Sequence, residues 1–525
     1  MTDQARQFVD EITEAVRPLF TTYTHAVWEA AISGSDEANE QEKETQAALM
    51  RFWADGERHD QAKRLSQADH DDALIERTLK VIFLSAAKAQ QDEATIQELT
   101  ELEASIRAAY YNFRAEIDGQ RLTDNQLDNM LRTSTDTGEV QAAYLASKQI
   151  GAEVADDVRQ LARARNRAAQ EQGFRDHFHK SLTLDEIDET WLMATFDKLD
   201  QLTREPFGQL KGSMDDHLAR RFGLATADLR PWHYGDRFFQ IAPSLSDFDL
   251  DQVYQGKDPV KLSLATYDGL GLEVRSILER SDLYARDGKN QHAFCLDLDR
   301  EGDVRTLNNL EPNLRWIKTL LHELGHAVYD ELIDRSLPWV LRDPPHTLST
   351  EAVAILMGER TFDEKWLREV MGVSSDEARQ VAEFAQQRQR AEKLIFTRWV
   401  LVMTNFERTM YADPDADLDN LWWDLVERYQ QLTRPDGRSA PDWAAKYHIP
   451  LAPVYYHNYE LGSILAAQIE ESLNQQAGGL TGNKAAGEWL RRQVFLPGAR
   501  FDWRSHAEHA NRRPFAMEAF VTSLS

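Results

Sequence analysis

The stretch from Asn313 to Leu332 carries apolar residues at the three- and four-residue spacing of an amphipathic helix. Inside it, residues 322–326 read His-Glu-Leu-Gly-His, and neither histidine falls on the apolar stripe. Pro312, just before this stretch, suits a first helical position. In a helix, His322 and His326 lie one turn apart and point the same way. The segment therefore predicts a helix that packs into a core by one face and presents two imidazoles from another.

Two histidines at this spacing, with a glutamate directly after the first, are typical of zinc sites that activate water. His322 and His326 are the predicted metal ligands. Glu323 lies beside the ion's place, where it could take a proton from the water. Gly325 would leave room for a substrate to approach the metal. The pattern predicts a hydrolytic Zn²⁺ centre, and the alternative is a helix with two solvated histidines.

Glu351 is the predicted third zinc ligand. It lies near the start of a second predicted helix, 348–356, which Ser349 or Thr350 would cap. The loop Pro338–Pro345 lets this helix turn back toward the first. Two histidines and one glutamate form the ligand set of many catalytic zinc sites and leave a fourth position open for water or substrate.

Composition excludes several classes of function. The chain has 60 Lys and Arg against 88 Asp and Glu, a formal net charge of −28, which suits neither a nucleic-acid partner nor an anionic membrane. No apolar run is long enough for a membrane span, and the N-terminus lacks the apolar segment of a signal peptide. Cys295 is the one cysteine, so no internal disulfide forms. We expect a cytoplasmic protein, and the oligomeric state stays unknown.

Most of the chain predicts helix, because apolar residues recur at helical spacing and Gly and Pro are sparse. The clearest stretches are 2–32, 41–114, 140–172 and 184–222, with a break at 229–261. Within a second break, Phe294, Leu296 and Leu298 alternate with polar or small residues, as in a strand. A turn at 300–303 and a return strand at 304–307 complete a predicted hairpin.

The predicted fold class is mostly α, with two helical lobes around a deep cleft and the small β-hairpin beside the zinc helix, as in gluzincins. We expect 1–525 to form a single peptidase unit made of two interleaved helical subdomains. The zinc site falls within 290–360, and a segment for substrate and oxyanion falls within 440–465.

The second of these segments contains Lys-Tyr-His-Ile-Pro-Leu-Ala-Pro-Val-Tyr-Tyr-His-Asn-Tyr at 446–459. Tyr456 and Tyr459 are three residues apart, so both could face one side of a helix. A tyrosine hydroxyl or His448 could donate a hydrogen bond to an oxyanion. By themselves, however, these aromatic residues fit a packed core better than a catalytic role.

Four separated blocks of the sequence resemble the angiotensin-converting-enzyme-like (peptidyl-dipeptidase A) zinc metallopeptidases, which are related to thimet oligopeptidase and oligopeptidase F. They are the His-Glu-Leu-Gly-His motif, Glu351, the segment Gln-His-Ala-Phe-Cys-Leu-Asp at 291–297, and Lys-Tyr-His-Ile-Pro at 446–450 with the tyrosines that follow. The weaker resemblance extends over nearly the full length and implies the same fold.

The resemblance also implies roles for individual residues. His292 and Ala293 would bind the backbone of a peptide substrate as part of an edge strand. Lys446 and Tyr456 would bind its C-terminal carboxylate. His448 and Tyr459 would donate to the oxyanion of the transition state, as the family's histidine and tyrosine do.

The chain departs from the family at two places that bear on the site. The family's Trp-Ala-Gln segment, whose glutamine helps to hold the substrate carboxylate, has no clear equivalent, and the nearest stretch is Trp232-His233-Tyr234. Ile355 stands where the family has an aspartate that supports the metal site. We therefore expect a looser carboxylate pocket and a differently built outer shell around the zinc.

Together these features predict a zinc-dependent peptidase of short peptides that releases dipeptides from the C-terminus. An internal-cleaving oligopeptidase and a metallocarboxypeptidase that releases single residues remain as alternatives. A third alternative is an inactive zinc-binding helical scaffold, although the intact Glu323 favours catalysis.

Overall fold

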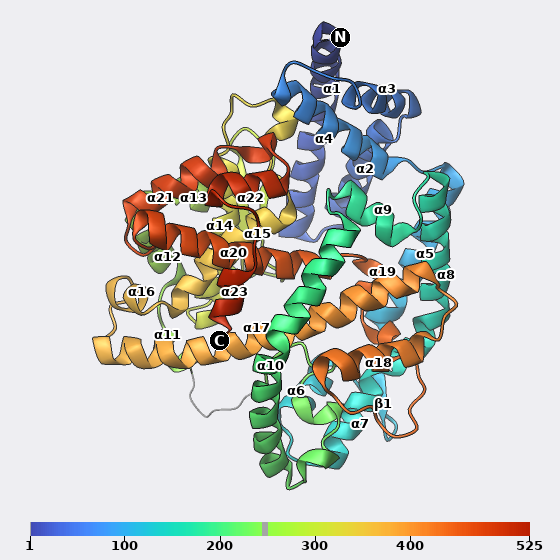
Figure 1. The fold of residues 1–525 in the computed structure, drawn as a ribbon, viewed down its shortest axis with the longest axis vertical. Helices are drawn as coiled ribbons and strands as arrows, with labels where there is room; N and C mark the ends of the chain where they lie inside the picture. Colours follow the sequence, from blue (N-terminus) through green and yellow to red (C-terminus); the bar gives the residue numbers. More distant parts are fainter. Residues whose placement is uncertain (1, 244–249, 525) are drawn as a thin grey trace. The chain divides into compact units, whose positions relative to one another are not determined.

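The computed structural model describes residues 2–243 and 250–524, and helices make up most of it (Figure 1). The strands in these residues form two small antiparallel hairpins. The predicted mostly-α class with a small β-hairpin is therefore confirmed. No helix within the described ranges has an apolar stretch long enough to cross a bilayer.

The chain divides into two compact units, each assembled from segments that are distant in sequence. Unit 1 comprises residues 2–90, 250–386 and 461–520, and unit 2 comprises residues 91–243, 387–460 and 521–524. The predicted cleft between two lobes and the single peptidase unit over 1–525 stay predictions.

Unit 1 holds the predicted metal motif. Its elements are α1 (Thr2–Ser33), α2 (Asp36–Trp53), α3 (Gly56–Ser66), α4 (Ala73–Ala89), α11 (Asp251–Tyr254), α12 (Pro259–Leu270), α13 (Arg275–Arg280), β3 (Phe294–Asp297), β4 (Val304–Leu307), α14 (Leu314–Glu331), η3 (Trp339–Leu341), α15 (Thr347–Gly358), η4 (Glu359–Phe362), α16 (Glu364–Glu369), α21 (Lys484–Leu490), η6 (Arg491–Phe495), η7 (Gly498–Arg500) and α22 (Trp503–Asn511).

Unit 2 holds the predicted segment for substrate and oxyanion. Its elements are α5 (Glu93–Asn112), β1 (Ala115–Ile117), β2 (Gln120–Leu122), α6 (Asp124–Thr133), α7 (Thr137–Ser147), α8 (Gln149–Glu171), α9 (His177–Leu184), α10 (Glu189–Phe222), η1 (Thr226–Asp228), η2 (Pro231–Tyr234), α18 (Leu418–Gln430), η5 (Asp442–Ala445) and α19 (His448–Leu451). The residues of α17 (Ser375–Ala412), α20 (Tyr456–Ala477) and α23 (Glu518–Ser523) are divided between the two units.

Aspartate caps divide the long predicted helical stretch 41–114 into separate helices. The side chains of Asp55, Asp72 and Asp92 each accept a hydrogen bond from a backbone N–H in the first turn of α3, α4 and α5. Such a bond satisfies a donor that has no partner within the helix, so it favours a new helix start. The predicted stretch 2–32, in contrast, forms the single helix α1.

The break predicted at 229–261 falls partly on residues 244–249, which lie outside the described residues. Its described part contains only the short helices η2 and α11 and the first turn of α12. The interruption of the long helices is therefore confirmed where it is described.

The hairpin predicted before the metal helix is confirmed. Strands β3 and β4 pair in antiparallel register, with Phe294 opposite Leu307 and Asp297 opposite Val304. The turn between them places Arg300 and Gly302 at positive φ. Strand β3 also packs against α14, so the hairpin adjoins the metal helix.

A second hairpin, β1 and β2 in unit 2, was not predicted from the sequence. Its two-residue turn is Asp118-Gly119, and both residues have positive φ. An Asp-Gly pair between two short strands is a strong hairpin signal, because it fits a tight turn that requires positive φ. The surrounding helical periodicity obscured this signal.

Helix α8 approaches η5, just before Lys446, so closely that only glycine fits at Gly151. A β-carbon at Gly151 would clash with the carbonyl oxygen of Pro441 and lie 3.2 Å from the backbone nitrogen of Ala445. The backbone of α8 thus supports the segment that leads into the predicted substrate residues.

Replacing Gly151 with alanine is expected to destabilise the protein by about 1–3 kcal/mol, because the methyl group overpacks a backbone contact. The matched control is Gly212→Ala in α10, where no neighbouring atom of the described residues lies within 4 Å of the added carbon. This control is expected to gain up to about 1 kcal/mol from helix propensity. Denaturant unfolding measures both, and equal effects of the two substitutions would contradict the account.

Candidate functional site

Helix α14 carries the metal motif, and it starts at an asparagine cap. The Asn313 side chain accepts a hydrogen bond of 3.0 Å from the backbone N–H of Trp316, and the helix begins at Leu314. Pro312 therefore precedes the cap, and its predicted place at the first helical position is wrong. The predicted apolar stripe is buried along the helix, which leaves His322 and His326 on a different face.

Helix α15 carries Glu351, and its start differs from the prediction. His346 is the N-cap, and its Nδ1 accepts a hydrogen bond of 3.1 Å from the backbone N–H of Leu348. The predicted cap at Ser349 or Thr350 is wrong, because the helix begins earlier, at Thr347. Glu351 consequently lies in the second turn, where its side chain is directed by the helix.

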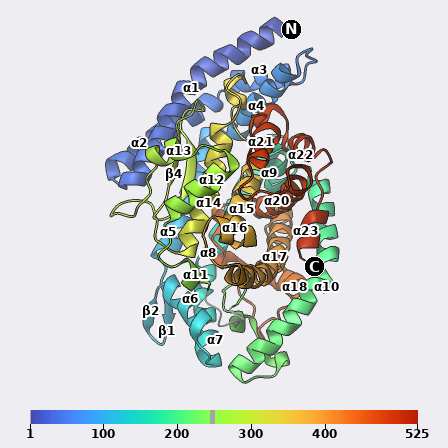
Figure 2. The same cartoon turned by 90° about the vertical axis from the view of Figure 1, so that its left-hand side faces the viewer.

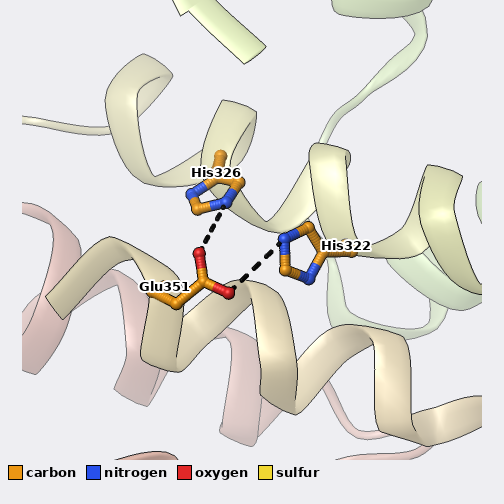
Figure 3. A group of neighbouring side chains, drawn as sticks. All are labelled: His322, His326 and Glu351. Atoms are coloured by element: carbon orange, nitrogen blue, oxygen red, sulfur yellow. Dashed lines mark ion pairs between the residues drawn. The ribbon is translucent and has the colours of Figure 1, made fainter. Parts of the chain in front are cut away.

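The three predicted ligands come together in unit 1. The Nε2 atom of His322 lies 3.8 Å from Oε1 of Glu351, and Nε2 of His326 lies 3.5 Å from Oε2 (Figure 3). All three offer a ligand atom within 4.8 Å of one another, and they form the one group of this kind found in the described residues. In Figure 3, both imidazoles project from one helix toward the carboxylate on the other.

These separations fit a zinc ion. Two ligands at about 2.1 Å from a tetrahedral ion lie roughly 3.4 Å apart, close to the distances observed. The side chains of His322, His326 and Glu351 remain 28 %, 17 % and 22 % exposed, so an ion and a water molecule can reach them. Two imidazoles and one carboxylate are also the donor types that zinc prefers.

The protonation states of the cluster suit metal binding. Burial lowers the pKa of His322 to about 4, although the charge of Glu351 opposes this shift. Burial alone would raise the pKa of Glu351, but the hydrogen bond with His326 and the two imidazoles outweigh it and hold that pKa below its usual value. At neutral pH the cluster therefore offers a neutral His322 and an ionised carboxylate, the forms that bind metal.

Glu323 lies next to His322 on α14 and is 7 % exposed. Burial raises the pKa of its carboxyl group to about 7, with the imidazole of His326 acting against the shift and the charge of Glu351 acting with it. A carboxyl group whose pKa is close to neutrality both accepts and returns a proton readily. This is the property that a general base in hydrolysis needs.

Gly325 allows α14 and α15 to approach closely, and the two helices lie side by side in both views (Figures 1 and 2). A β-carbon at Gly325 would lie 2.9 Å from Cα of Ala354 and 3.3 Å from the carbonyl oxygen of Val353. The prediction that this glycine leaves room for substrate is therefore wrong, because α15 fills the space. The close approach brings Glu351 to the histidines.

Helix α20 packs against the other side of Glu351. A β-carbon at Gly462 would lie 3.4 Å from Cγ of Glu351 and 3.4 Å from the carbonyl oxygen of Leu348. The methylene groups of Glu351 thus lie against the backbone of α20, and its carboxylate is directed at the imidazoles.

His292 and Ala293 directly precede strand β3. His292 is exposed, and its backbone N–H donates to Oδ1 of Asn290 over 2.9 Å. Strand β3 pairs with β4 along one edge. In the described parts of the chain, no strand pairs with its other, outer edge. An edge of this kind can accept an extended peptide as an additional strand.

The residues predicted to act on substrate from the second segment gather in unit 2. The ring centroids of His448 and Tyr456 are 5.1 Å apart, and those of Tyr456 and Tyr459 are 5.7 Å apart. The ammonium of Lys446 lies 5.5 Å from the Tyr456 ring and 5.1 Å from that of Trp399. Tyr456 and Tyr459 share the first turn of α20, as their spacing predicted.

Lys446 is a buried cation, and the sequence did not reveal that Gln240 is its polar partner. It is 6 % exposed, and its Nζ donates to Oε1 of Gln240 over 2.8 Å. The nearest stretch to the family's Trp-Ala-Gln, Trp232–Tyr234, instead forms the buried turn η2. Gln240 lies in an irregular segment without periodicity, so no sequence signal pointed to it.

Burial also sets the ionisation of this cluster. It lowers the pKa of Lys446 to about 8, with the charge of Asp236 opposing the shift. It lowers the pKa of His448 to about 4, and the nearby charge of Lys446 acts in the same direction. At neutral pH, Lys446 is mostly protonated and His448 is neutral.

The chain between His448 and Tyr456 passes through a strained residue. Val454 has φ of 53°, which is rare for a β-branched side chain. Its backbone N–H donates to Oε1 of the buried Glu407 over 2.7 Å. Strain of this kind persists only where the surroundings enforce it, and here the hydrogen bond with Glu407 holds the Val454 backbone in place.

Replacing Gly325 with alanine is expected to weaken zinc binding at least tenfold, because the added methyl group pushes α15 and Glu351 away from the histidines. Competition with a chromophoric chelator measures the affinity. Gly212→Ala, the same substitution in an uncrowded helix, is the control and should bind zinc as the original chain does. Equal zinc affinities in the original chain, Gly325→Ala and Gly212→Ala would contradict the claim that the close crossing of α14 and α15 positions Glu351.

A sequence model of the angiotensin-converting enzyme family of peptidases matches residues 1–228 and 275–513. The matched ranges include the metal cluster, His292 and the segment 446–459, whereas Gln240 falls in the gap between them. Among curated proteins, none matches the chain. Since the match covers most of the 525 residues, the chain belongs to the angiotensin-converting enzyme family of zinc metallopeptidases.

Proposed function

We propose that this protein is a zinc-dependent peptidyl-dipeptidase, which releases dipeptides from the C-termini of short peptides. The observation that carries this proposal is the buried ammonium of Lys446, held by Gln240 beside Tyr456. A buried cation with an amide and a phenol beside it is suited to a single carboxylate. A peptide has such a group at its C-terminus, so this cluster favours cleavage near a free end.

The metal centre supplies the hydrolytic part of the proposal. His322, His326 and Glu351 would hold zinc, and a bound zinc ion would lower the pKa of water and polarise the carbonyl of the peptide bond. Glu323 takes the proton from the attacking water and later passes it to the leaving amine. The buried position of Glu323 supports this role, because burial raises its pKa toward neutrality.

His448 and Tyr459 are the proposed donors to the oxyanion. His448 is neutral at pH 7 because burial lowers its pKa to about 4, so it donates through one ring N–H without adding a charge. Tyr459 donates through its phenolic O–H. Donors fixed in place before the reaction stabilise the developing charge without having to reorganise.

His292 and Ala293 are the proposed contacts for the peptide backbone. The outer edge of β3, which follows them, would align the substrate as an added strand. Side-chain preference would then come from the surroundings of that strand rather than from the backbone contacts.

Products from a free-acid peptide and from its C-terminally amidated form distinguish the proposal from its alternatives. We expect dipeptides from the free-acid peptide and a rate at least tenfold lower for the amide, since one charge-assisted contact is lost. Mass spectrometry identifies the products. Single amino acids would indicate a carboxypeptidase, and cleavage insensitive to amidation would indicate an internal-cleaving oligopeptidase.

Gln240→Glu is expected to raise KM for free-acid peptides at least tenfold, because the new carboxylate pairs with Lys446 and occupies its charge. The slow cleavage of the amidated peptide should change little, which makes this substrate the internal control. An unchanged KM for the free acid would remove Gln240 and Lys446 from carboxylate binding.

Glu323→Gln is expected to keep zinc bound while kcat falls by about 10²–10⁴-fold, because the proton acceptor is lost. Glu331→Gln is the matched control on the same helix, where the carboxylate pairs with Arg280 instead. Metal analysis and peptide hydrolysis are measured for both variants. Unchanged turnover in Glu323→Gln would contradict the assignment of Glu323 as the general base. A parent protein that hydrolyses no peptide would favour the alternative of an inactive zinc-binding scaffold.

A further inference from the structure

Helix α15 contacts both imidazoles of the metal cluster as well as supplying the carboxylate. Nδ1 of His326 lies 2.7 Å from Oγ1 of Thr350, and the His322 ring makes a hydrogen bond with the backbone of Ala354. Thr350, Glu351 and Ala354 lie within one turn of α15. A single helical turn therefore faces both histidines of α14, which are themselves one turn apart.

These contacts decide which ring nitrogen is available to a metal. The Nε2 atoms of both histidines face Glu351, so their lone pairs must point there if a cation is bound. The proton of a neutral imidazole then sits on Nδ1, and in His326 this N–H donates to the hydroxyl oxygen of Thr350. The His322 ring makes its own hydrogen bond with the backbone of Ala354, on the same helix as Thr350.

Two other side chains near Thr350 on helix α15 make no hydrogen bond with His326. Ile355 has no polar atom, so it offers nothing to either imidazole. Ser349 carries a hydroxyl one residue before Thr350, but its buried Oγ has no hydrogen-bond partner among the described residues. The 2.7 Å contact between Nδ1 of His326 and Oγ1 of Thr350 thus depends on the Thr350 hydroxyl group, and no other polar side chain of this turn replaces it.

We propose that Thr350 is a positioning residue of the metal centre, which fixes the tautomer and the ring orientation of His326 through its hydroxyl group. The hydroxyl group is a neutral acceptor, so it adds no negative charge to the centre. A neutral acceptor makes the imidazole less basic than a carboxylate would, so the affinity for zinc depends on orientation more than on charge. This inference rests on the zinc centre of the proposed function and is independent of the dipeptide specificity.

Thr350→Val keeps the shape of the side chain and removes the hydroxyl. We expect its zinc dissociation constant, from competition with a chromophoric chelator, to rise about 10–100-fold. Thr350→Ser restores the hydroxyl and should bind zinc within about threefold of the parent. Ser349→Ala removes the unpartnered hydroxyl from the same turn and should leave the affinity unchanged. If Thr350 served only to pack the helix, its substitution would instead lower the melting temperature of the zinc-free protein, in proportion to the packing contacts that are lost.

The result that overturns the proposal is a zinc affinity of Thr350→Val within about threefold of the parent, or an equal loss in Ser349→Ala. If the valine variant does not fold, Thr350→Ala is compared with Thr350→Ser in the same assay, with the same expected difference. A parent protein that binds zinc but hydrolyses no peptide would count against the proposed function alone. A parent protein that binds no zinc would overturn both.

Discussion

The close crossing of α14 and α15 is the contact on which the proposed metal centre depends. Zinc needs ligand atoms within a few ångströms of one another, and here they come from two helices. Gly325 permits that spacing, because any larger side chain would meet the backbone of Ala354. The crossing also places Thr350 and Ala354 against the rings of the two histidines. Ligand supply and ligand orientation therefore follow from one packing interaction.

Burial controls the chemistry of both residue clusters. It keeps His322 and His448 neutral at pH 7. It also raises the pKa of Glu323 to about 7, where a carboxyl group can both accept and return a proton. It also makes the ammonium of Lys446 costly, since the oxygen of Gln240 and the adjacent rings replace only part of its hydration. A cation in such surroundings gains from binding a carboxylate, and this gain is the basis of the proposed preference for peptide ends.

The sequence predicted the elements whose signals are local and periodic. The metal helix, the hairpin before it and the paired tyrosines could be read from spacing alone. The start of α15 could not, because His346, Ser349 and Thr350 all offer side chains that can cap a helix, and only the packing selects among them. Gln240 was missed since it lies in an irregular segment, and a contact between residues distant in sequence leaves no local pattern. The role of Gly325 was misread because a missing side chain does not reveal what fills its space.

The central claim is that two histidines of α14 and one glutamate of α15 bind a single zinc ion. X-ray absorption spectroscopy of the purified protein, with metal analysis of the same sample, tests it most directly. The account predicts one zinc ion per chain with two imidazole ligands and oxygen ligands, and loss of that ion in Glu351→Ala. Full zinc occupancy in Glu351→Ala with an unchanged spectrum would contradict it.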